Sequence, residues 1–119
     1  MKLLRAGIIL TWAATVAGAQ EPASVGVGAV LRGLDKINGQ VVDLDLANGE
    51  GADFGNLRVD LAQCRYPEGN PAGDAYAFLT IREQSSGQEL FSGWMLASSP
   101  ALNALEHPRY DVWVLRCKI

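Results

Sequence analysis

The chain has 119 residues and a formal net charge of −3, with 49% hydrophobic and 19% charged residues. This length leaves room for one domain, which buries only a modest part of its surface. The acidic balance excludes a basic surface that could neutralise several phosphates, so we expect no nucleic-acid partner.

The first 19 residues have the features of an export signal. Lys2 and Arg5 form a basic start, an apolar run covers residues 6–16, and residues 17–19 are the small residues that a signal peptidase reads. The apolar run is shorter than the roughly 20 residues that a bilayer span needs. We therefore expect residues 1–19 to be a cleaved signal peptide; a buried N-terminal helix is the alternative. Cleavage changes the net charge from −3 to −5 and leaves a soluble chain without a membrane span.

Residues 20–29 are rich in Gly, Ala and Val without any hydrophobic period, which predicts a flexible leader ahead of a single β domain over residues 30–119. In that domain, short pairs or triplets of turn-forming residues recur between apolar runs. These turn signals are Asn38-Gly39, Asn48-Gly49, Gly55-Asn56 and Ser85-Ser86-Gly87. Consecutive hairpins build antiparallel sheets, whereas parallel sheets need long crossover connections.

Apolar residues alternate with polar ones along the expected strands. Residues 41–46 alternate Val or Leu with Asp, which is typical of a strand with one exposed face, and residues 57–61 follow the same pattern. Residues 75–81 and 110–117 are apolar on both faces, which predicts that they are covered on both sides. We expect a mainly β fold of about seven strands, arranged as a small antiparallel β-sandwich or a partly open barrel.

One short segment predicts a helix. Ser99 is suited to cap it, and Pro100 suits its first position, where a missing N–H costs nothing. The next six residues complete about two turns before a His-Pro pair ends them. Leu102 and Leu105 share one face of this helix, which we expect to plug an open end of the sheet.

Cys64 and Cys117 are the two cysteines of the chain. An exported protein meets an oxidising compartment, so we expect a disulfide rather than two buried thiols, near the ends of two strands in one sheet system. Closing this loop would stabilise the fold by roughly 4 kcal/mol, as an upper estimate. The cysteines are isolated and the chain has a single histidine, so we expect no zinc site.

The segment before the last apolar run contains the residue types of a hydrolase. Ser98 or Ser99 would have to lie within about 3 Å of His107 to form a nucleophile–base pair, and Asp111 would complete a triad. The expected helix places Ser99 and His107 roughly 10 Å apart, and no Gly-x-Ser-x-Gly elbow occurs. Glu106, His107 and Asp111 could instead offer oxygen and nitrogen ligands to a metal. The favoured role of His107 is a local hydrogen bond that fixes the turn into the last strand.

Trp94 and Trp113 each have two interpretations. Both could fill the small core with large aromatic area, or they could form a stacking platform for a sugar or for a partner's side chain. Trp113 has apolar neighbours on both sides, which favours the core. Trp94 follows Gly93, which allows close approach, so Trp94 is the better candidate for binding.

The sequence also resembles a known family. Residues 32–40 (RGLDKINGQ), the strand ending at Cys64, residues 77–84 (AFLTIREQ) and above all residues 91–118 (FSGWMLASSPALNALEHPRYDVWVLRCK) are similar to the family catalogued as domain of unknown function 2155. This family comprises small exported proteins of Gram-negative bacteria, chiefly alphaproteobacteria. The resemblance extends over nearly all of the chain after the expected signal peptide and implies a periplasmic location. It carries no established activity and transfers no catalytic residues.

We therefore expect a non-enzymatic binding or interaction module of the cell envelope, with an envelope protein as partner and with neither cofactor nor metal. Aromatic and arginine side chains at a rigid turn are typical interface anchors. The expected docking residues line a rim beside the plug: Trp94, Glu106, His107, Arg109 and Tyr110. The alternative is a small hydrolase or metal-assisted enzyme that uses Glu106, His107 and Asp111.

Overall fold

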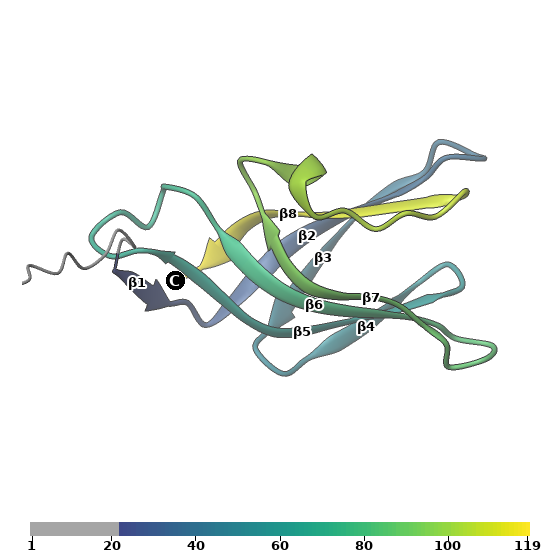
Figure 1. The fold of residues 1–119 in the computed structure, drawn as a ribbon, viewed down its shortest axis with the longest axis horizontal. Coiled ribbons are helices and arrows are strands. Elements are labelled where there is room, and N and C mark those ends of the chain that lie inside the picture. Colours follow the sequence, from purple (N-terminus) through teal and green to yellow (C-terminus); the bar gives the residue numbers. More distant parts are fainter. Residues whose placement is uncertain (1–21) are drawn as a thin grey trace, which may run out of the picture.

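Eight strands and one short turn of 3-10 helix make up the fold. The computed structural model describes residues 22–119, so the expected signal peptide lies outside the described residues (Figure 1). The strands are β1 (Ala23–Val25), β2 (Gly28–Asp35), β3 (Val41–Ala47), β4 (Gly51–Phe54), β5 (Leu57–Pro67), β6 (Tyr76–Glu83), β7 (Glu89–Leu96) and β8 (Tyr110–Lys118). The 3-10 turn, η1, spans Pro100–Leu102. Across residues 22–119, no helix has the length and apolar character that crossing a membrane requires.

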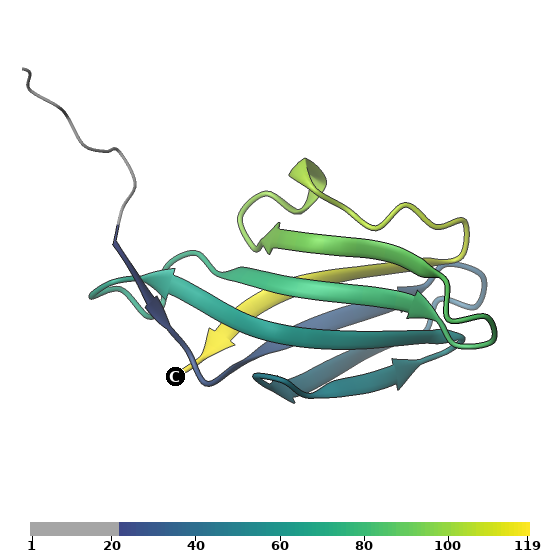
Figure 2. The ribbon, with the colours of Figure 1, turned by 60° about the horizontal axis from the view of Figure 1, so that its bottom comes forward.

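The strands form two antiparallel sheets that pack face to face (Figures 1 and 2). A five-stranded sheet has the order β1-β5-β6-β7, with β4 also paired to β5, and a three-stranded sheet has the order β3-β2-β8. β4 and β1 share one edge of β5, because β4 pairs with residues 57–60 and β1 with residues 65–67. The prediction of a mainly β fold is confirmed, and of its two forms the structure shows the sandwich.

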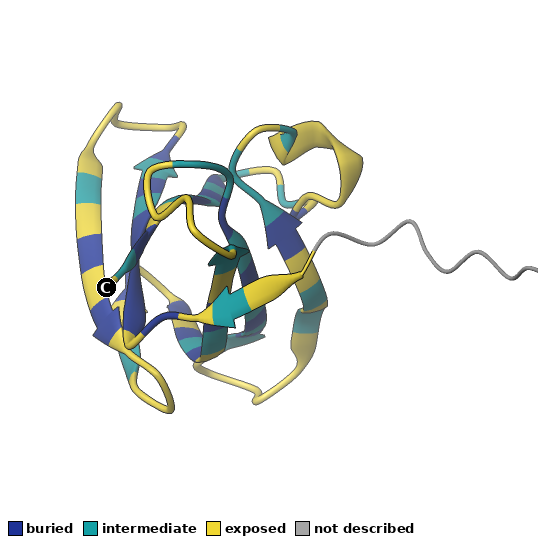
Figure 3. Cartoon of the chain, turned by 90° about the vertical axis from the view of Figure 1, so that its left-hand side faces the viewer, coloured by how far each residue is buried: buried dark blue, intermediate teal, exposed yellow. Residues whose placement is uncertain are grey.

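The core lies between the two sheets and follows the side-chain alternation of the sequence. In β3, Leu44 and Leu46 are buried and the two aspartates are exposed, as predicted. β6 and β8 also bury every second residue of their regular parts, but their other face is only partly covered. The prediction that these two strands are covered on both sides is therefore wrong. Figure 3 shows the resulting bands of buried and less buried residues along the strands.

Glycines at the expected turns adopt the left-handed backbone conformation. Gly39, Gly49, Gly55 and Gly87 have φ angles of 75°, 84°, 57° and 74°, a region that residues with a Cβ rarely enter. Each of these glycines lies between two successive strands. The four predicted turns are therefore confirmed. The sequence predicted about seven strands and the structure has eight, of which β1 was not expected.

The expectation of a flexible leader is wrong for residues 23–29. Residues 23–25 form β1, which pairs with the end of β5, and β2 already begins at Gly28. The small residues have a packing role here. A Cβ on Gly26 would lie 2.6 Å from the carbonyl oxygen of Lys118, and one on Gly28 would overlap the backbone of β3. The missing hydrophobic period thus reflects close approach of backbones rather than flexibility.

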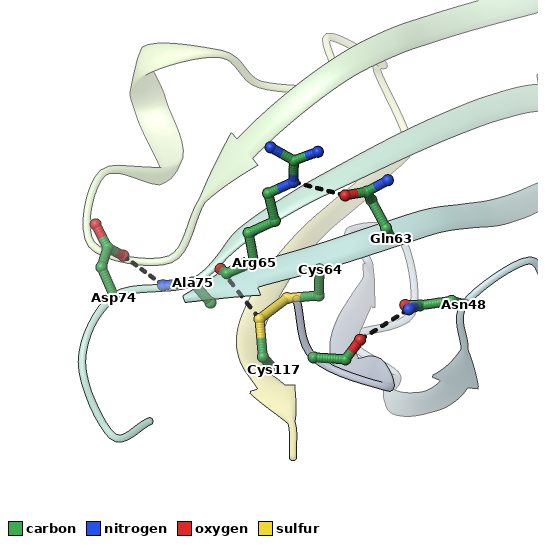
Figure 4. Close-up of a disulfide and its surroundings, with 8 residues drawn as sticks. Asn48, Gln63, Cys64, Arg65, Asp74, Ala75 and Cys117 are labelled. Carbon is green, nitrogen blue, oxygen red and sulfur yellow. Dashed lines mark hydrogen bonds between the residues drawn. A yellow bond between two sulfur atoms is a disulfide. The ribbon is translucent and has the colours of Figure 1, made fainter. Parts of the chain in front are cut away.

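A disulfide between Cys64 of β5 and Cys117 of β8 ties the two sheets together (Figure 4). Their Cα atoms are 5.6 Å apart, and both residues are buried. The pairing is the expected one, but the two strands belong to different sheets rather than to one. The reason is that β8 pairs with β2 in the three-stranded sheet. The disulfide therefore links the two sheets covalently across the core of the sandwich.

The expected two-turn helix is a single 3-10 turn, η1. The Ser99 side chain makes no capping hydrogen bond, and Asn103 ends the turn in an extended conformation with a φ of −148°. The Asn103 amide instead donates to the backbone carbonyl of Trp94 at 2.8 Å; such side-chain bonds compete with helix formation. Leu105 is 4% exposed whereas Leu102 is 73% exposed. The two leucines do not share a face, and only Leu105 enters the core.

Candidate functional site

Three of the expected docking residues meet at one corner, where the chain enters β8. The Nδ1 atom of His107 accepts hydrogen bonds from the backbone N–H groups of Arg109 at 3.0 Å and of Tyr110 at 3.2 Å. Its Nε2 atom lies 4.0 Å from Oε2 of Glu83. The imidazole therefore fixes the turn into the last strand, which is the local role that the sequence favoured. We call this place the His107 corner.

Arg109 is held by a carboxylate that is distant in the sequence. Its Nε and Nη2 atoms donate to the two oxygens of Asp35 at 2.8 to 3.1 Å, and the Asp35 side chain is only 6% exposed. Asp35 also accepts the backbone N–H of Ile37 at 2.9 Å. These hydrogen bonds, with Arg109 contributing most, hold the pKa of Asp35 below its usual value, and the same pair raises the pKa of Arg109. Arg109 thus joins the β2–β3 hairpin to the start of β8.

Tyr110 is a core residue, which corrects its expected place in a docking surface. It is 2% exposed, and its ring meets that of Phe54 edge-on with centroids 5.4 Å apart. Its hydroxyl accepts the backbone N–H of Asn56 at 3.2 Å and packs on Gly55, where a Cβ would overlap it. Tyr110 therefore locks the β4–β5 turn onto β8, and its side chain is not available to a partner.

The residues of the enzyme alternative do not converge. Ser98 gives both its backbone N–H, at 2.9 Å, and its hydroxyl, at 2.6 Å, to Asp74. Asp111 lies 3.7 Å from a lysine, and Glu106 is exposed. The second nitrogen of His107 faces a glutamate of β6 rather than either of these carboxylates. Within the described part of the chain, no three His, Cys, Asp or Glu side chains come close enough to hold a metal ion.

A pocket of about 240 Å³ lies between η1 and β8. Its lining is largely apolar and includes Leu105, Val112 and Trp113, with Asp111 as its single ionisable side chain. General acid–base chemistry needs a group of suitable basicity within reach of a second reacting group. One carboxylate that already faces a lysine does not supply such a pair.

Trp94 lies elsewhere, on the outer face of the five-stranded sheet. It is 36% exposed and stands nearly perpendicular to Phe78, with ring centroids 5.3 Å apart. The guanidinium carbon of Arg65 lies 5.5 Å from the centroid of the Trp94 ring, within range of a cation–π interaction. Alternate residues of a strand share a face, and the strand register adds the neighbours of these three. We call the whole set the aromatic face: Gln63, Arg65, Tyr76, Phe78, Trp94 and Leu96.

The aromatic face and the His107 corner are separate places on the molecule. Phe78 pairs with Trp94 across β6 and β7, whereas Glu83, at the end of β6, is the residue that faces His107. At about 3.3 Å per residue, the stretch of β6 from Phe78 to Glu83 spans roughly 16 Å. The single rim expected from the sequence is therefore wrong.

Sequence reasoning missed Arg65, Tyr76 and Phe78 as surface residues. The signal was present, because the residues of β6 are apolar on both faces, but it was interpreted as a strand covered on both sides. A two-layer sandwich has no third layer, so apolar residues on an outer face meet solvent. Trp113, which the sequence assigned to the core, is likewise half-buried on the outer face of the three-stranded sheet, between the buried Val112 and Val114.

Comparison with known proteins identifies the family. Residues 29–117 match the family described as "Uncharacterized protein conserved in bacteria (DUF2155)". The chain belongs to DUF2155. The uncharacterized protein RP359 of Rickettsia prowazekii (strain Madrid E) is 33% identical over 87 residues, which are 71% of this chain and 56% of that relative. The chain thus spans little more than half the length of the curated relative, and no solved structure matches it. The DUF2155 match includes both cysteines, the aromatic face and the His107 corner.

Proposed function

We propose that this DUF2155 protein is a periplasmic, non-enzymatic binding module of the cell envelope, and that its protein partner docks on the aromatic face. The observation that carries the proposal is the exposed Trp94, packed against Phe78 and covered on one side by Arg65. Tryptophan, tyrosine and arginine are enriched among the few interface residues that carry most of the binding energy. The mutual packing of these side chains also restricts their rotamers in advance, which lowers the entropy lost on docking.

Export rests on two features. Residues 1–19 have the basic start, the apolar run and the small residues of a signal peptide, and the Cys64–Cys117 bond belongs to a class that persists in oxidising compartments. The enzyme alternative has no comparable support, because His107, Ser98 and Asp111 are each engaged with other parts of the domain.

Trp94→Ala tests the proposed docking site, with Trp113→Ala as the matched control on the opposite sheet. Tagged variants are produced in the native bacterium and recovered from the periplasmic fraction, where the intact mass should correspond to a chain that begins at Gln20. Captured proteins are then compared by quantitative mass spectrometry. Loss of an interface tryptophan should reduce partner capture about tenfold or more, whereas Trp113→Ala should capture as wild type does.

Two results would contradict the proposal. Undiminished capture by the Trp94 variant would place docking elsewhere on the domain. A protein that retains Met1 and stays in the cytoplasm would contradict export. Thermal unfolding of both variants is the control for folding: an unchanged unfolding midpoint means that a loss of capture does not come from a loss of folding.

A further inference from the structure

Arg65 is the basic side chain of the aromatic face, and no carboxylate in the described part of the chain lies within ion-pair distance of it. Its neighbours on the same sheet differ. Arg58 pairs with Asp53 at 3.1 Å and with Asp60 at 3.4 Å, and Arg82 pairs with Asp60 at 3.3 Å. Arg65, in the aromatic part of the outer face, therefore has no carboxylate partner among the described residues. Arg58 and Arg82, in the polar part of the same face, are neutralised by aspartates.

The guanidinium of Arg65 is also held in a defined orientation. Its Nε atom donates to Oε1 of Gln63 at 2.6 Å, and its carbon lies over the Trp94 ring. A guanidinium is a planar fork that can bind a carboxylate through two parallel hydrogen bonds. With Nε used by Gln63, the free edge of the fork is the pair of terminal nitrogens. Figure 4 shows these two nitrogens at the tip of the Arg65 side chain, beyond its contact with Gln63 and on the side of β5 opposite the disulfide.

We propose that the aromatic face binds an acidic segment of the partner protein. The two terminal nitrogens of Arg65 donate parallel hydrogen bonds to the two oxygens of an Asp or Glu carboxylate in that segment. An apolar side chain next to that carboxylate packs on Phe78 and Tyr76. The pairing supplies the charge complement that Arg65 lacks among residues 22–119, and the neighbouring apolar contact excludes water from the ion pair. This inference rests on the proposed function and names the chemistry of the partner.

Two other classes of ligand fit the same face less well. An anionic lipid surface attracts clusters of cations, whereas this chain has a net charge of −3 and the nearby Arg58 and Arg82 are already paired. A sugar would stack on an open aromatic ring, whereas Arg65 lies against the face of Trp94 and Phe78 is packed edge to face with it. A protein carboxylate can bind the terminal nitrogens of Arg65 while the guanidinium stays on the Trp94 ring.

The test is site-specific crosslinking in cells. The substitution Phe78→p-benzoylphenylalanine, which keeps an aromatic ring at this position, is introduced into the full-length chain, and the crosslinked peptide is identified by mass spectrometry. We expect that peptide to carry an Asp or Glu within about two residues of the crosslink. Adding Arg65→Glu should lower the crosslink yield about tenfold or more. Arg65→Lys should give an intermediate yield, because an ammonium group keeps the charge but cannot form the two parallel hydrogen bonds of a guanidinium. Arg116→Glu, an exposed arginine of β8, is the matched control and should leave the yield unchanged.

The outcomes separate this inference from the proposed function. A crosslink to a protein segment without an acidic residue, or an unchanged yield with Arg65→Glu, overturns the inference and leaves the docking module standing. A crosslink to lipid or glycan overturns the protein partner. No crosslinked product at all overturns both. When an acidic residue is found, its replacement by Lys in the partner should restore crosslinking to the Arg65→Glu variant.

Discussion

Asp35 is a buried carboxylate that depends on one side chain for its charge balance. Removing the guanidinium of Arg109 leaves that charge buried without its partner. A protein loses more stability from such a change than from the loss of an exposed ion pair. Arg109→Ala should therefore lower the thermal unfolding midpoint clearly. Arg32→Ala removes the exposed pair with Asp43 and should change it little. Circular dichroism melts compare the two variants, and equal shifts would contradict the structural role of Arg109.

The same pair gives this prediction a pH dependence. The pKa of Asp35 is lowered in the folded state, chiefly by Arg109. Its contribution is therefore fully present above the unfolded-state pKa of about 3.9 and is lost as pH falls through the lower folded-state value. Arg109→Ala removes the chief cause of this lowered pKa and leaves the backbone hydrogen bonds to Asp35. The urea midpoints of wild type and variant should accordingly differ most near neutral pH and converge below about pH 4; a constant difference across that range would show that Asp35 is not responsible.

The sequence distinguished some of these residue roles and not others. The local bond of His107 could be predicted because its partners lie two and three positions away. The partner of Arg109 could not, because Asp35 is 74 positions distant and meets it only through the pairing of β2 with β8. Tyr110 was misassigned because an aromatic residue beside an arginine at a turn is typical of an interface. Its inward direction follows from the alternation with Val112, which the sequence already contained.

Among the elements, the link between the loop before β6 and the loop after β7 depends on Ser98 rather than on Ser99. The Ser98 hydroxyl donates to Asp74 at 2.6 Å, whereas the Ser99 side chain caps nothing. Ser98→Ala should therefore lower the free energy of unfolding by about 1 kcal/mol, the typical value of one hydrogen bond. Ser99→Ala should change it by a few tenths of that at most. Urea unfolding of the two variants measures the difference, and a larger loss with Ser99→Ala would restore the capped helix expected from the sequence.

Elements were predictable where a period and a turn residue agreed. Each turn from β2 to β7 contains a glycine with positive φ, and β3, β5 and β8 contain clear runs of apolar residues; both signals are local. The predictions at β1 and at η1 were wrong for different reasons. β1 is three residues long and is defined by its pairing with β5, which no local pattern shows. η1 has the proline of a helix start, but the side chain of Asn103 bonds to the neighbouring strand and the helix does not continue.

For the molecule as a whole, the Cys64–Cys117 bond is the covalent link between the two layers. It spans 53 positions of sequence, so it should stabilise the fold by roughly 4 kcal/mol as an upper estimate, through the entropy that it removes from the unfolded chain. Replacing both cysteines by Ser should lower the free energy of unfolding by a few kcal/mol in urea. Alkylation supplies the control: native protein should take up no label until reductant is added. Ready labelling without reductant would mean that the bond is not formed.

The order of strands in the three-stranded sheet has a consequence for when the protein can fold. β2 lies in the middle of that sheet, between β3, which follows it directly, and β8, which is the last strand of residues 22–119. Until residues 110–118 arrive, one edge of β2 has no partner and Cys64 has no second sulfur. Pairings between such distant segments form slowly, and unpaired strand edges invite association in the meantime. In a chain of this topology, the three-stranded sheet and the disulfide therefore form only once β8 is present.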